Sequence, residues 1–484
     1  MRGEEVDMVG WLLLGIVVLF LAVILIRALR FRPADEEEHQ EVRPDFDGEM
    51  AVSHLQQMIR CRTVSYQDHD LEDQEEFEKL RALLPQFYPT VFSTCTVEHV
   101  DRTGLLFHWK GKRDDSPSVL MAHYDVVPVV ESEWEKPPFE GVIEDGVLWG
   151  RGTLDTKITF CSSLEAAETL MKKGFVPEQD IYLSYAGDEE TGGNGAPSIV
   201  SLLESRGIKP GMVVDEGGAV VENVFPGVEG KMALIGIGEK GKLELTLRVR
   251  GNGGHASAPL PHGPVGYLAK AVVAVEDHPF PARLSGPVAA MFDTLGRRSS
   301  FLYRVIFANL WCFLPVLDMI CRKSGGELNA MLRTTCAFTQ MQGSAANNVI
   351  PPSATVGANL RLIEGDTVAS AVEYIRRTVN NADVEVIAES GDEPSPTSRY
   401  DTEGWSRVRK AVEQTWPEAV VSPYLMVQCS DSRHFNRICD NIYKFSAMEL
   451  TKEERGLIHG NNERIPLEKI GKAVQFYMNL EALC

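Results

Sequence analysis

The sequence predicts an α/β fold: a mostly parallel-sheet domain with a smaller α+β domain inserted into it. Up to about residue 220, strand-like runs alternate with helix-like runs, a pattern typical of a parallel sheet covered by helices. Beyond residue 231 the alternation gives way to strands at 232–238, 243–250, 354–361 and 384–387, with helices at 265–275 and 368–379. A chain of 484 residues is also longer than a domain with a single hydrophobic core usually is, so its length favours two domains.

Five segments follow from this pattern. We predict an N-terminal membrane anchor at 1–32, an acidic linker at 33–47, the first part of the catalytic domain at 48–238, the inserted domain at 239–390, and the second part of the catalytic domain at 391–484. The catalytic domain must resume after the insertion because His459 belongs with acidic residues that precede residue 220.

The predicted anchor is the run 8–26, which contains no charged side chain. As a helix it spans about 28 Å, enough for the hydrocarbon core of a bilayer. A signal peptide and a buried helix are the alternatives. A signal peptide begins with basic residues, whereas here acidic residues precede the run and Arg27, Arg30 and Arg32 follow it. We therefore predict a retained, single-pass anchor.

Charge and cysteine usage bear on partners and on the side of the membrane. The net charge of -21 argues against binding to nucleic acid. Basic residues on the enzyme side of the anchor favour the cytosol for the catalytic domain. The absence of Asn-x-Ser/Thr sequons and the scatter of nine cysteines agree with that side. The orientation stays open, because absent sequons and an odd cysteine count also occur in lumenal proteins.

The larger domain begins with helix-like spacing at 48–59 and 74–87, and further helices are predicted at 164–173 and 198–205. Between them, strand-like runs end in polar, glycine-containing loops. Runs 118–122, 181–186 and 212–214 are followed by His123 and Asp125, by Glu189 and Glu190, and by Asp215. Because loops at the carboxyl ends of parallel strands build the sites of open α/β sheets, these side chains are predicted to meet.

These residue types suit a pair of divalent metal ions. Two ions about 3.5–4 Å apart need a bridging carboxylate, terminal nitrogen and oxygen ligands, and an open position for water. Mixed nitrogen and oxygen donors favour zinc, although manganese and cobalt accept the same donors. The predicted ligands are Asp155 as the bridge, His123 and Asp215 on one ion, and Glu190 and His459 on the other.

Two further acids are predicted to support the chemistry. Asp125 follows His123 by two residues and can orient its imidazole, as carboxylates commonly do for metal-bound histidines. Glu189 neighbours a ligand but faces the bridging water as general base and carries the proton to the leaving nitrogen. Taken singly, a His-x-Asp or a Glu-Glu pair is more often ordinary surface or a satisfied core pair. Together, and in this order, the residues are specific.

The whole set resembles the co-catalytic di-zinc metallopeptidases that include aminoacylase and carboxypeptidase S, and within them the branch of carboxypeptidase S and the vertebrate N-fatty-acyl-amino-acid synthase/hydrolases. The resemblance covers about residues 50–482. Its motifs lie at 121–128, 150–155, 188–192, 214–218, 253–259, 348–351 and 458–461.

The resemblance implies roles for further residues. Asp125 and Glu189 form the catalytic pair, and the inserted domain serves as lid and dimerisation surface in a homodimer. His255 stabilises the tetrahedral oxyanion, often across the dimer interface, and Asn348 and Arg361 hold the substrate's carboxylate. A guanidinium fork suits a carboxylate better than an ammonium does. Thr156 departs from the pattern, because relatives commonly carry a second acid at that position.

The implied reaction is cleavage, and reversibly formation, of the amide bond in N-fatty-acyl amino acids. The alternative is a carboxypeptidase S-like metallo-carboxypeptidase or dipeptidase, since both enzymes cut an amide next to a free carboxylate. The apolar segment 279–332 favours the long acyl chain. It is interpreted either as core and dimer packing or as a surface for a lipid-like substrate or the membrane.

Two other functions are weighed. The run 236–241 formally fits a dinucleotide fingerprint, but that motif requires a helix directly afterwards and the residues at 243–250 alternate like a strand. A membrane-anchored binding protein that has lost its metals would keep the fold without the chemistry. The presence of every expected ligand argues against it.

Overall fold

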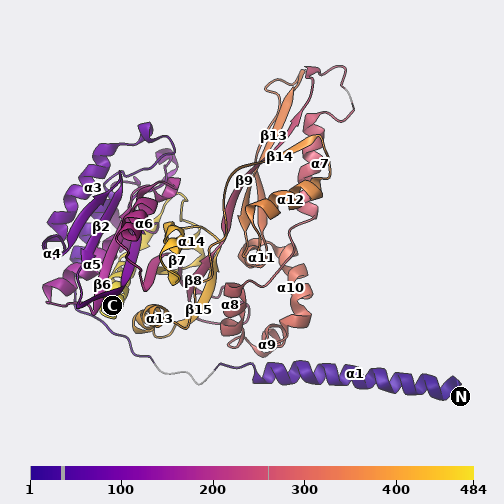
Figure 1. Cartoon of the computed structure of the whole chain (residues 1–484), viewed down its shortest axis with the longest axis horizontal. Coiled ribbons are helices and arrows are strands. Elements are labelled where there is room, and N and C mark those ends of the chain that lie inside the picture. The colour runs from indigo at the N-terminus through magenta and orange to yellow at the C-terminus, as the bar shows by residue number, and fades with distance from the viewer. Residues whose placement is uncertain (1, 34–38, 260) are drawn as a thin grey trace.

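The structure is a computed structural model that describes residues 2–33, 39–259 and 261–484. It consists of a larger α/β domain, a smaller α+β domain that rises from it, and a long N-terminal helix that extends beyond both (Figure 1). Each domain has a hydrophobic core of its own. The predicted fold class is confirmed.

An eight-stranded mixed sheet forms the larger domain. Its central pairs β3–β6, β3–β7 and β7–β16 are parallel, whereas β1–β2 and β2–β6 are antiparallel. β6 is buried along its whole length, as expected of a strand covered by helices on both faces. In spatial order the strands are β1 (Thr96–Val100), β2 (Gly104–Trp109), β6 (Gln179–Ala186), β3 (Arg113–His123), β7 (Met212–Glu222), β16 (Ile442–Leu450), β8 (Lys231–Glu239) and β15 (Val420–Met426).

Helices surround this sheet, and the predicted ones at 48–59 and 74–87 are confirmed to the residue. The helices are α2 (Gly48–Ile59), α3 (Gln74–Phe87), α4 (Pro89–Thr94), α5 (Lys157–Lys172), α6 (Gly195–Ser205), α13 (Glu403–Thr415), α14 (Lys452–Arg455) and α15 (Leu467–Glu481). Short 3-10 turns lie at η1 (His69–Leu71), η2 (Glu131–Glu133), η3 (Glu189–Thr191) and η4 (Asp431–Arg437). A small sheet of β17 (Arg464–Pro466), β5 (Val147–Trp149) and β4 (Val142–Glu144) flanks them.

The smaller domain is an antiparallel sheet packed against two helices. β9 buries Leu243, Leu245, Leu247 and Val249 in alternation, so one face of the strand points into the smaller core. The strands lie in the order β11 (Thr335–Gln342), β13 (Ser353–Leu362), β9 (Gly241–Arg250) and β14 (Val384–Asp392), with helices α7 (Pro264–Asp277) and α12 (Val368–Val379). Since β9 begins at Gly241, a strand and not a helix follows the glycine-containing run 236–241, which removes the basis for nucleotide binding.

Four helices within the predicted insertion, α8 (Gly286–Gly296), α9 (Phe301–Phe307), α10 (Leu310–Ser324) and α11 (Gly326–Leu332), pack against the larger domain. Their buried side chains, among them Phe292, Leu295, Phe307 and Leu332, belong to the larger core, and α8 contacts β15. The larger core therefore takes part of its volume from the inserted residues. The predicted domain bounds themselves stay a prediction.

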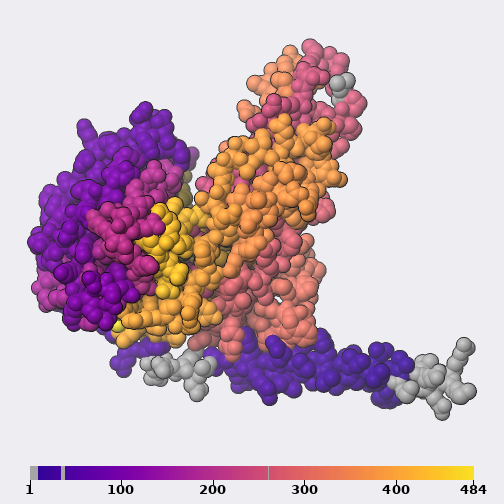
Figure 2. Space-filling view, in the orientation of Figure 1, coloured from indigo at the N-terminus to yellow at the C-terminus, as the bar shows by residue number. Residues whose placement is uncertain are grey.

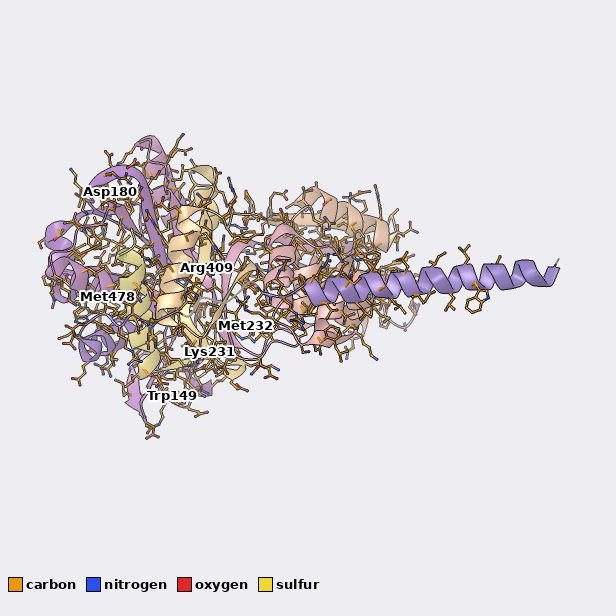
Figure 3. All side chains as sticks on the ribbon, turned by 90° about the horizontal axis from the view of Figure 1, so that it is seen from below. Trp149, Asp180, Lys231, Met232, Arg409 and Met478 are labelled. Carbon is orange, nitrogen blue, oxygen red and sulfur yellow. The ribbon has the colours of Figure 1, made fainter. Side chains whose placement is uncertain are left out.

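The N-terminal helix α1 (Arg2–Arg30) projects away from the rest of the molecule, and most side chains of residues 9–26 are exposed (Figure 3). The most apolar 18-residue window of its segment Val9–Arg30 has a mean hydropathy of 3.1, and the segment is long and apolar enough to cross a membrane. By length and composition alone, a signal sequence or a core helix meets the same criterion.

Residues 34–38 of the predicted acidic linker lie outside the described residues. The described part of the linker is docked on the protein. Val42 N donates to the carbonyl of Gln414, and Val42 O accepts a 2.8 Å hydrogen bond from Gln475. Glu41 pairs with Lys472. The linker is therefore not simply solvated over residues 41–42, because its backbone binds α13 and α15.

Candidate active site

Two neighbouring strands, β3 and β6, end side by side at one edge of the larger sheet, and a third, β7, passes the same edge and continues to Glu222. β3 ends at His123, which lies beside Ala186 of β6, and η3 with Glu189 and Glu190 follows β6 directly. The next strand, β7, carries Asp215. This is the edge at which open α/β sheets place their sites, as predicted from the loops.

Asp155 lies between two imidazoles. Its Oδ1 is 3.1 Å from His123 Nε2, and its Oδ2 is 3.1 Å from His459 Nε2. His459 Nε2 also lies 3.0 Å from Glu190 Oε2. One carboxylate thus faces one histidine with each oxygen, which is the arrangement required of a bridging ligand.

Two sets of ligand atoms lie close enough to hold a metal ion. The first set is His123, Glu189 and Glu216. The second set is His123, Asp155 and Glu190. Within each set the ligand atoms lie within 4.8 Å of one another. Within the described residues, the buried Oε1 of Glu190 has no hydrogen-bond partner. An unpaired buried carboxylate oxygen is costly unless a cation or donor satisfies it. The donors therefore fit divalent ions with nitrogen and oxygen ligands.

Asp125 holds the parts of the site together. His123 Nδ1 lies 3.1 Å from the backbone carbonyl and 3.3 Å from the carboxylate of Asp125, which leaves Nε2 facing Asp155. The same carboxylate accepts hydrogen bonds from the backbone N–H groups of Glu189 and Glu190, and a 2.7 Å bond from the hydroxyl of Ser65. The Asp125 carboxylate therefore lies against the His123 ring and fixes the η3 turn, and its role in orienting a metal-bound imidazole stays a prediction.

Asp215 and its neighbour Glu216 face different groups in the structure. The carboxylate of Asp215 accepts 2.9 Å hydrogen bonds from the backbone N–H groups of Glu216 and Ser432, so both of its oxygens face the protein backbone. Glu216 Oε1 instead lies 3.6 Å from His123 Nε2. That Asp215 is a ligand stays a prediction, and Glu216 joins the candidate ligands.

A β-bulge explains the position of Glu216. The pairing of β7 with β16 steps from Asp215 opposite Lys444 to Gly218 opposite Phe445, so residues 216 and 217 are left out of the ladder. Such a bulge redirects a side chain. Glycine is required at 218, where a Cβ would lie 1.8 Å from the carbonyl oxygen of Leu234.

The clustered charges shift the titration of their neighbours. Burial would lower the pKa of His123, but Glu216, Asp125 and Asp155 outweigh it and raise that pKa well above its usual value. Hydrogen bonds to Asp155 and Glu190 raise the pKa of His459 to about 10. Burial, reinforced by Asp155, raises the pKa of Glu216 to about 8. The site therefore holds excess negative charge that protons, or metal ions, neutralise.

Sequence reasoning missed Glu463, which shapes the loop that carries Asp155. Its Oε1 accepts hydrogen bonds from the backbone N–H groups of Leu154 and Asp155, at 2.6 and 3.2 Å. Its Oε2 accepts a 2.7 Å bond from Arg151. Both members of this pair are buried. No local motif marks Glu463, because its partners lie some three hundred positions earlier in the chain.

Arg151 extends this contact to the second histidine. Its Nη2 donates to the carbonyl of Gly460 at 3.0 Å and lies 3.3 Å from the carbonyl of His459. The loops before Asp155 and around His459 are therefore held by one buried ion pair. Thr156 is buried beside them, and its hydroxyl donates to Thr159 and not to the ligand cluster.

A cavity of about 620 Å³ begins at the ligand cluster. Asp155, Glu189, Glu190, Glu216 and His459 line one part of it. The rest is largely apolar and runs between the strands β7, β8, β15 and β16 and the helix α11. Its apolar lining comprises Ala219, Val221, Leu234, Ala330, Tyr424, Met426, Met448, Leu450 and Ile458.

His255 and Asn348 lie next to each other in the smaller domain, outside the cavity lining. β10 (Gly254–His255) pairs with β12 (Val349–Ile350), and Ala256 N donates to the carbonyl of Asn348. Both side chains are exposed. The strand β9, ten residues long, separates them from Gly241 near the cavity, a span of about 33 Å. Within one chain they do not join the cluster.

Arg361 lies closer to the cavity. Its Nη1 contacts Cys429 Sγ at 3.1 Å, and Cys429 is part of the cavity lining. Arg361 therefore reaches the border between the two domains from β13. Seen from the side of Figure 2, the surface is hollowed between these domains.

The chain is similar to known proteins along most of its length. The model of peptidase family M20/M25/M40 matches residues 119–481. The N-fatty-acyl-amino acid synthase/hydrolase PM20D1 of Xenopus tropicalis is 36% identical over 480 residues, covering 97% of this chain and 93% of the relative. The probable carboxypeptidase S-like 2 of Dictyostelium discoideum is 34% identical, covering 87% of this chain and 82% of the relative.

The fold is shared with a solved structure. The M20 family metallo-carboxypeptidase Sso-CP2 from Sulfolobus solfataricus superposes with a TM-score of 0.67 at 18% identity, covering 90% of this chain and 98% of that one.

Proposed function

This chain belongs to peptidase family M20/M25/M40 and is a metal-dependent amide hydrolase, and from this premise we propose that it cleaves and forms the amide bond of N-fatty-acyl amino acids. One observation carries the choice of substrate: the cavity joins the ligand cluster to a largely apolar wall. Sites for small molecules are commonly concave and mostly apolar with a few convergent polar groups. An acyl chain would lie along this wall, with its amide at the cluster.

The apolar wall supports a preference for long acyl chains. Met426, Met448 and Leu450 expose little surface to solvent and line the cavity beyond the cluster. Each methylene group buried there contributes about 0.8 kcal/mol. Eight additional buried methylenes would therefore contribute up to about 6 kcal/mol. A dipeptide has no fatty acyl chain to bury along this wall.

Two divalent ions, most suitably zinc, would be held by His123, Asp155, Glu190 and His459, with Asp215 or Glu216 completing the set. When bound, such ions lower the pKa of water and polarise the scissile carbonyl. Burial raises the pKa of Glu189 well above its usual value, which suits a group that accepts a proton and passes it on. We assign Glu189 as the base that takes the proton of the attacking water and gives it to the leaving nitrogen.

The overall reaction consumes one water. The C–N bond breaks, the hydroxyl adds to the acyl carbon, and the amine leaves with the proton. Because the same groups act in both directions, the site condenses a fatty acid with an amino acid when both are plentiful. Arg361, on the border of the cavity, would hold the amino acid's carboxylate.

His255 and Asn348 would come from a second copy of the chain. Their distance along β9 from the cavity within one chain supports this assignment, since the family role of His255 requires it to reach the reacting carbonyl. We propose a homodimer in which each inserted domain completes the partner's site.

The helix α1 would anchor the enzyme in a membrane. Its segment Val9–Arg30 has the length and hydropathy of a span, and arginines 27 and 30 mark its end nearest the enzyme.

The test is turnover of oleoyl-phenylalanine against a panel of dipeptides by the full-length, metal-loaded chain. We expect kcat/KM for oleoyl-phenylalanine to exceed that for every dipeptide by at least about tenfold, a small part of the free energy available from chain burial. A preference for dipeptides would favour the carboxypeptidase S-like alternative, which the Dictyostelium relative supports.

A larger side chain in the cavity tests whether the acyl chain binds along the apolar wall. Met448→Trp narrows the cavity beside the apolar wall. We therefore expect loss of oleoyl-phenylalanine turnover while acetyl-phenylalanine turnover is retained. Met50→Trp, at an exposed position outside the cavity lining, serves as the matched control. Equal loss on both substrates would indicate damage to the fold and not a blocked chain.

A further inference from the structure

The helix α10 has an apolar face that points away from the protein. Leu317 and Cys321, one turn apart, are buried against the core. The opposite stripe exposes Trp311 at 60%, Met319 at 64% and Ile320 at 52% of their surface. A helix on a soluble protein usually presents polar residues on its outer stripe. Before the last turn of α10, which exposes Arg322 and Lys323, the outer stripe is instead apolar.

The neighbouring helix α9 extends the same surface. Its first residues, Phe301, Leu302 and Tyr303, are exposed, with Leu302 at 77%. α9 and α10 meet at a bend of 107° and together are apolar enough to pass as one broken span. We call the exposed side chains of α9 and α10 named here, together with Val316, the apolar face. Contiguous exposed apolar surface of this kind marks an interaction site.

The end of α1 nearest the enzyme is fixed to this same place. Arg27 donates two hydrogen bonds, of 2.9 and 3.1 Å, to the carbonyl of Ala308 at the end of α9. Asn309 donates to the carbonyl of Ile24 at 3.1 Å. The ring of Phe20 packs edge-on against Trp311, with 5.9 Å between centroids. The first residue of the apolar face on α10 therefore touches the membrane-spanning segment itself.

These contacts determine how deep Trp311 would lie in a bilayer that α1 crosses. Phe20 precedes Arg27 by seven residues, so it lies about 10 Å further along the helix axis. If Arg27 and Arg30 mark the bilayer surface, Trp311 lies about 10 Å below it, the depth at which interfacial helices bury their apolar side. In Figure 1, α10 runs across the direction of α1.

Charges agree with this placement. Arg297 lies over the ring of Phe31, just beyond α1, and Arg304 belongs to α9. At the far end of α10, Arg322 and Lys323 are exposed. Arg322 is paired with Asp318 and Arg297 with Asp293, so the placement rests on Arg304 and Lys323. Basic groups at the edge of an apolar helix face favour the headgroup layer, above all one with anionic lipid.

We propose that α9 and α10 form a second membrane contact, with the apolar face inserted into the leaflet beside α1. The occupant is bilayer lipid, because the apolar face is continuous with a helix that lipid would surround. This inference rests on the proposed anchor. It adds that the enzyme lies against the membrane in one fixed orientation.

The contact bears on how substrate arrives. α11 follows α10 after Gly325, and its residues Gly326, Glu327 and Ala330 line the cavity. The cavity wall and the membrane helix are thus consecutive in the chain. A fatty-acyl amphiphile dissolved in the leaflet would be presented beside the cavity without crossing bulk water.

The test measures quenching of tryptophan fluorescence by lipids brominated along their acyl chains, with the full chain in vesicles containing anionic lipid. The signals of Trp11 and Trp311 are obtained as differences between the parent and the Trp11→Phe and Trp311→Phe variants. We expect both tryptophans to be quenched. Quenching of Trp11 but not of Trp311 would overturn the second contact while leaving the anchor intact.

Loss of both signals would instead refute the anchor. A charged variant, Met319→Glu with Ile320→Glu, gives a second measurement: we expect quenching of Trp311 to fall at least twofold while that of Trp11 persists. The matched control places the same charges at Leu71 and Val176, which are exposed apolar residues on the larger domain. A different result would show that the apolar face joins two copies of the chain: Trp311 of the parent is not quenched, the parent is a dimer and the charged variant is a monomer. In that case the proposal is wrong.

Discussion

At the scale of single residues, the site is organised by carboxylates with different tasks. Asp155 faces both imidazoles, Asp125 fixes the ring of His123, and Glu189 has a pKa raised well above its usual value by burial. Neighbouring acids differ because Asp125 accepts hydrogen bonds from the backbone, whereas one oxygen of Glu190 has no partner within the described residues. Partnered carboxylates hold the geometry, and unpartnered ones are available to cations.

Glu189→Gln tests the assignment of the base. The amide keeps the shape of the side chain but cannot accept the proton, so we expect kcat to fall by about 10²- to 10⁴-fold with metal content unchanged. Steady-state kinetics with oleoyl-phenylalanine and elemental analysis give the two quantities. Glu140→Gln, at an exposed position, is the control. Turnover at the parental rate would remove Glu189 from the chemistry.

Metal binding is expected to release protons. In the metal-free chain the pKa of His459 is raised to about 10 and that of Glu216 to about 8, so near neutral pH both hold protons. Ligands must lose them to bind an ion, so zinc affinity should rise with pH by about tenfold per unit for each proton released. It should weaken as the pH falls. Calorimetric titration in buffers of different ionisation enthalpy measures the release, and buffer-independent heats would contradict it.

At the scale of elements, the strand ends and their loops form the site, and a single ion pair ties two of these loops together. Glu463 binds the loop that ends at Asp155, and Arg151 binds the carbonyls of the His459 loop. The strand ends could be predicted from apolar runs that stop at polar residues. The bulge that redirects Glu216 could not, because it depends on how β16 pairs with β7.

Glu463→Gln tests the ion pair between Glu463 and Arg151 that connects the two loops. The change leaves the buried guanidinium of Arg151 without its counter-charge, so we expect the free energy of unfolding to fall by about 3–5 kcal/mol. Weaker metal binding should accompany it, because Asp155 loses its backbone support. Urea denaturation measures the first effect. Glu135→Gln, which removes an exposed acid near the same loop, should change stability by less than about 0.5 kcal/mol.

At the scale of the whole molecule, the inserted domain extends away from the cavity that it is expected to serve. Family resemblance predicted the roles of His255 and Asn348, but a sequence of one chain does not say which copy supplies them. The structure separates them from the cavity by the length of β9. The contribution of α8–α11 to the larger core was equally hidden, since it depends on contacts between residues distant in the chain.

Mixing two inactive variants tests the shared site. Glu189→Gln and His255→Ala chains, each inactive alone, would form heterodimers in which one site has both intact residues. After exchange in equal amounts, activity should recover to about a quarter of the parent's. Failure to recover any activity, despite verified heterodimers, would place His255 in its own chain's site, and activity of His255→Ala alone would place it outside the reaction.

The central claim is that the cluster holds two ions on either side of Asp155, and anomalous scattering at the zinc edge from crystals of the loaded protein tests it most directly. We predict two peaks about 3.5–4 Å apart, one next to His123 and the other next to Glu190 and His459. The first peak also shows whether Asp215 or Glu216 completes its ligands. No peak, or a single peak away from Asp155, would contradict the account.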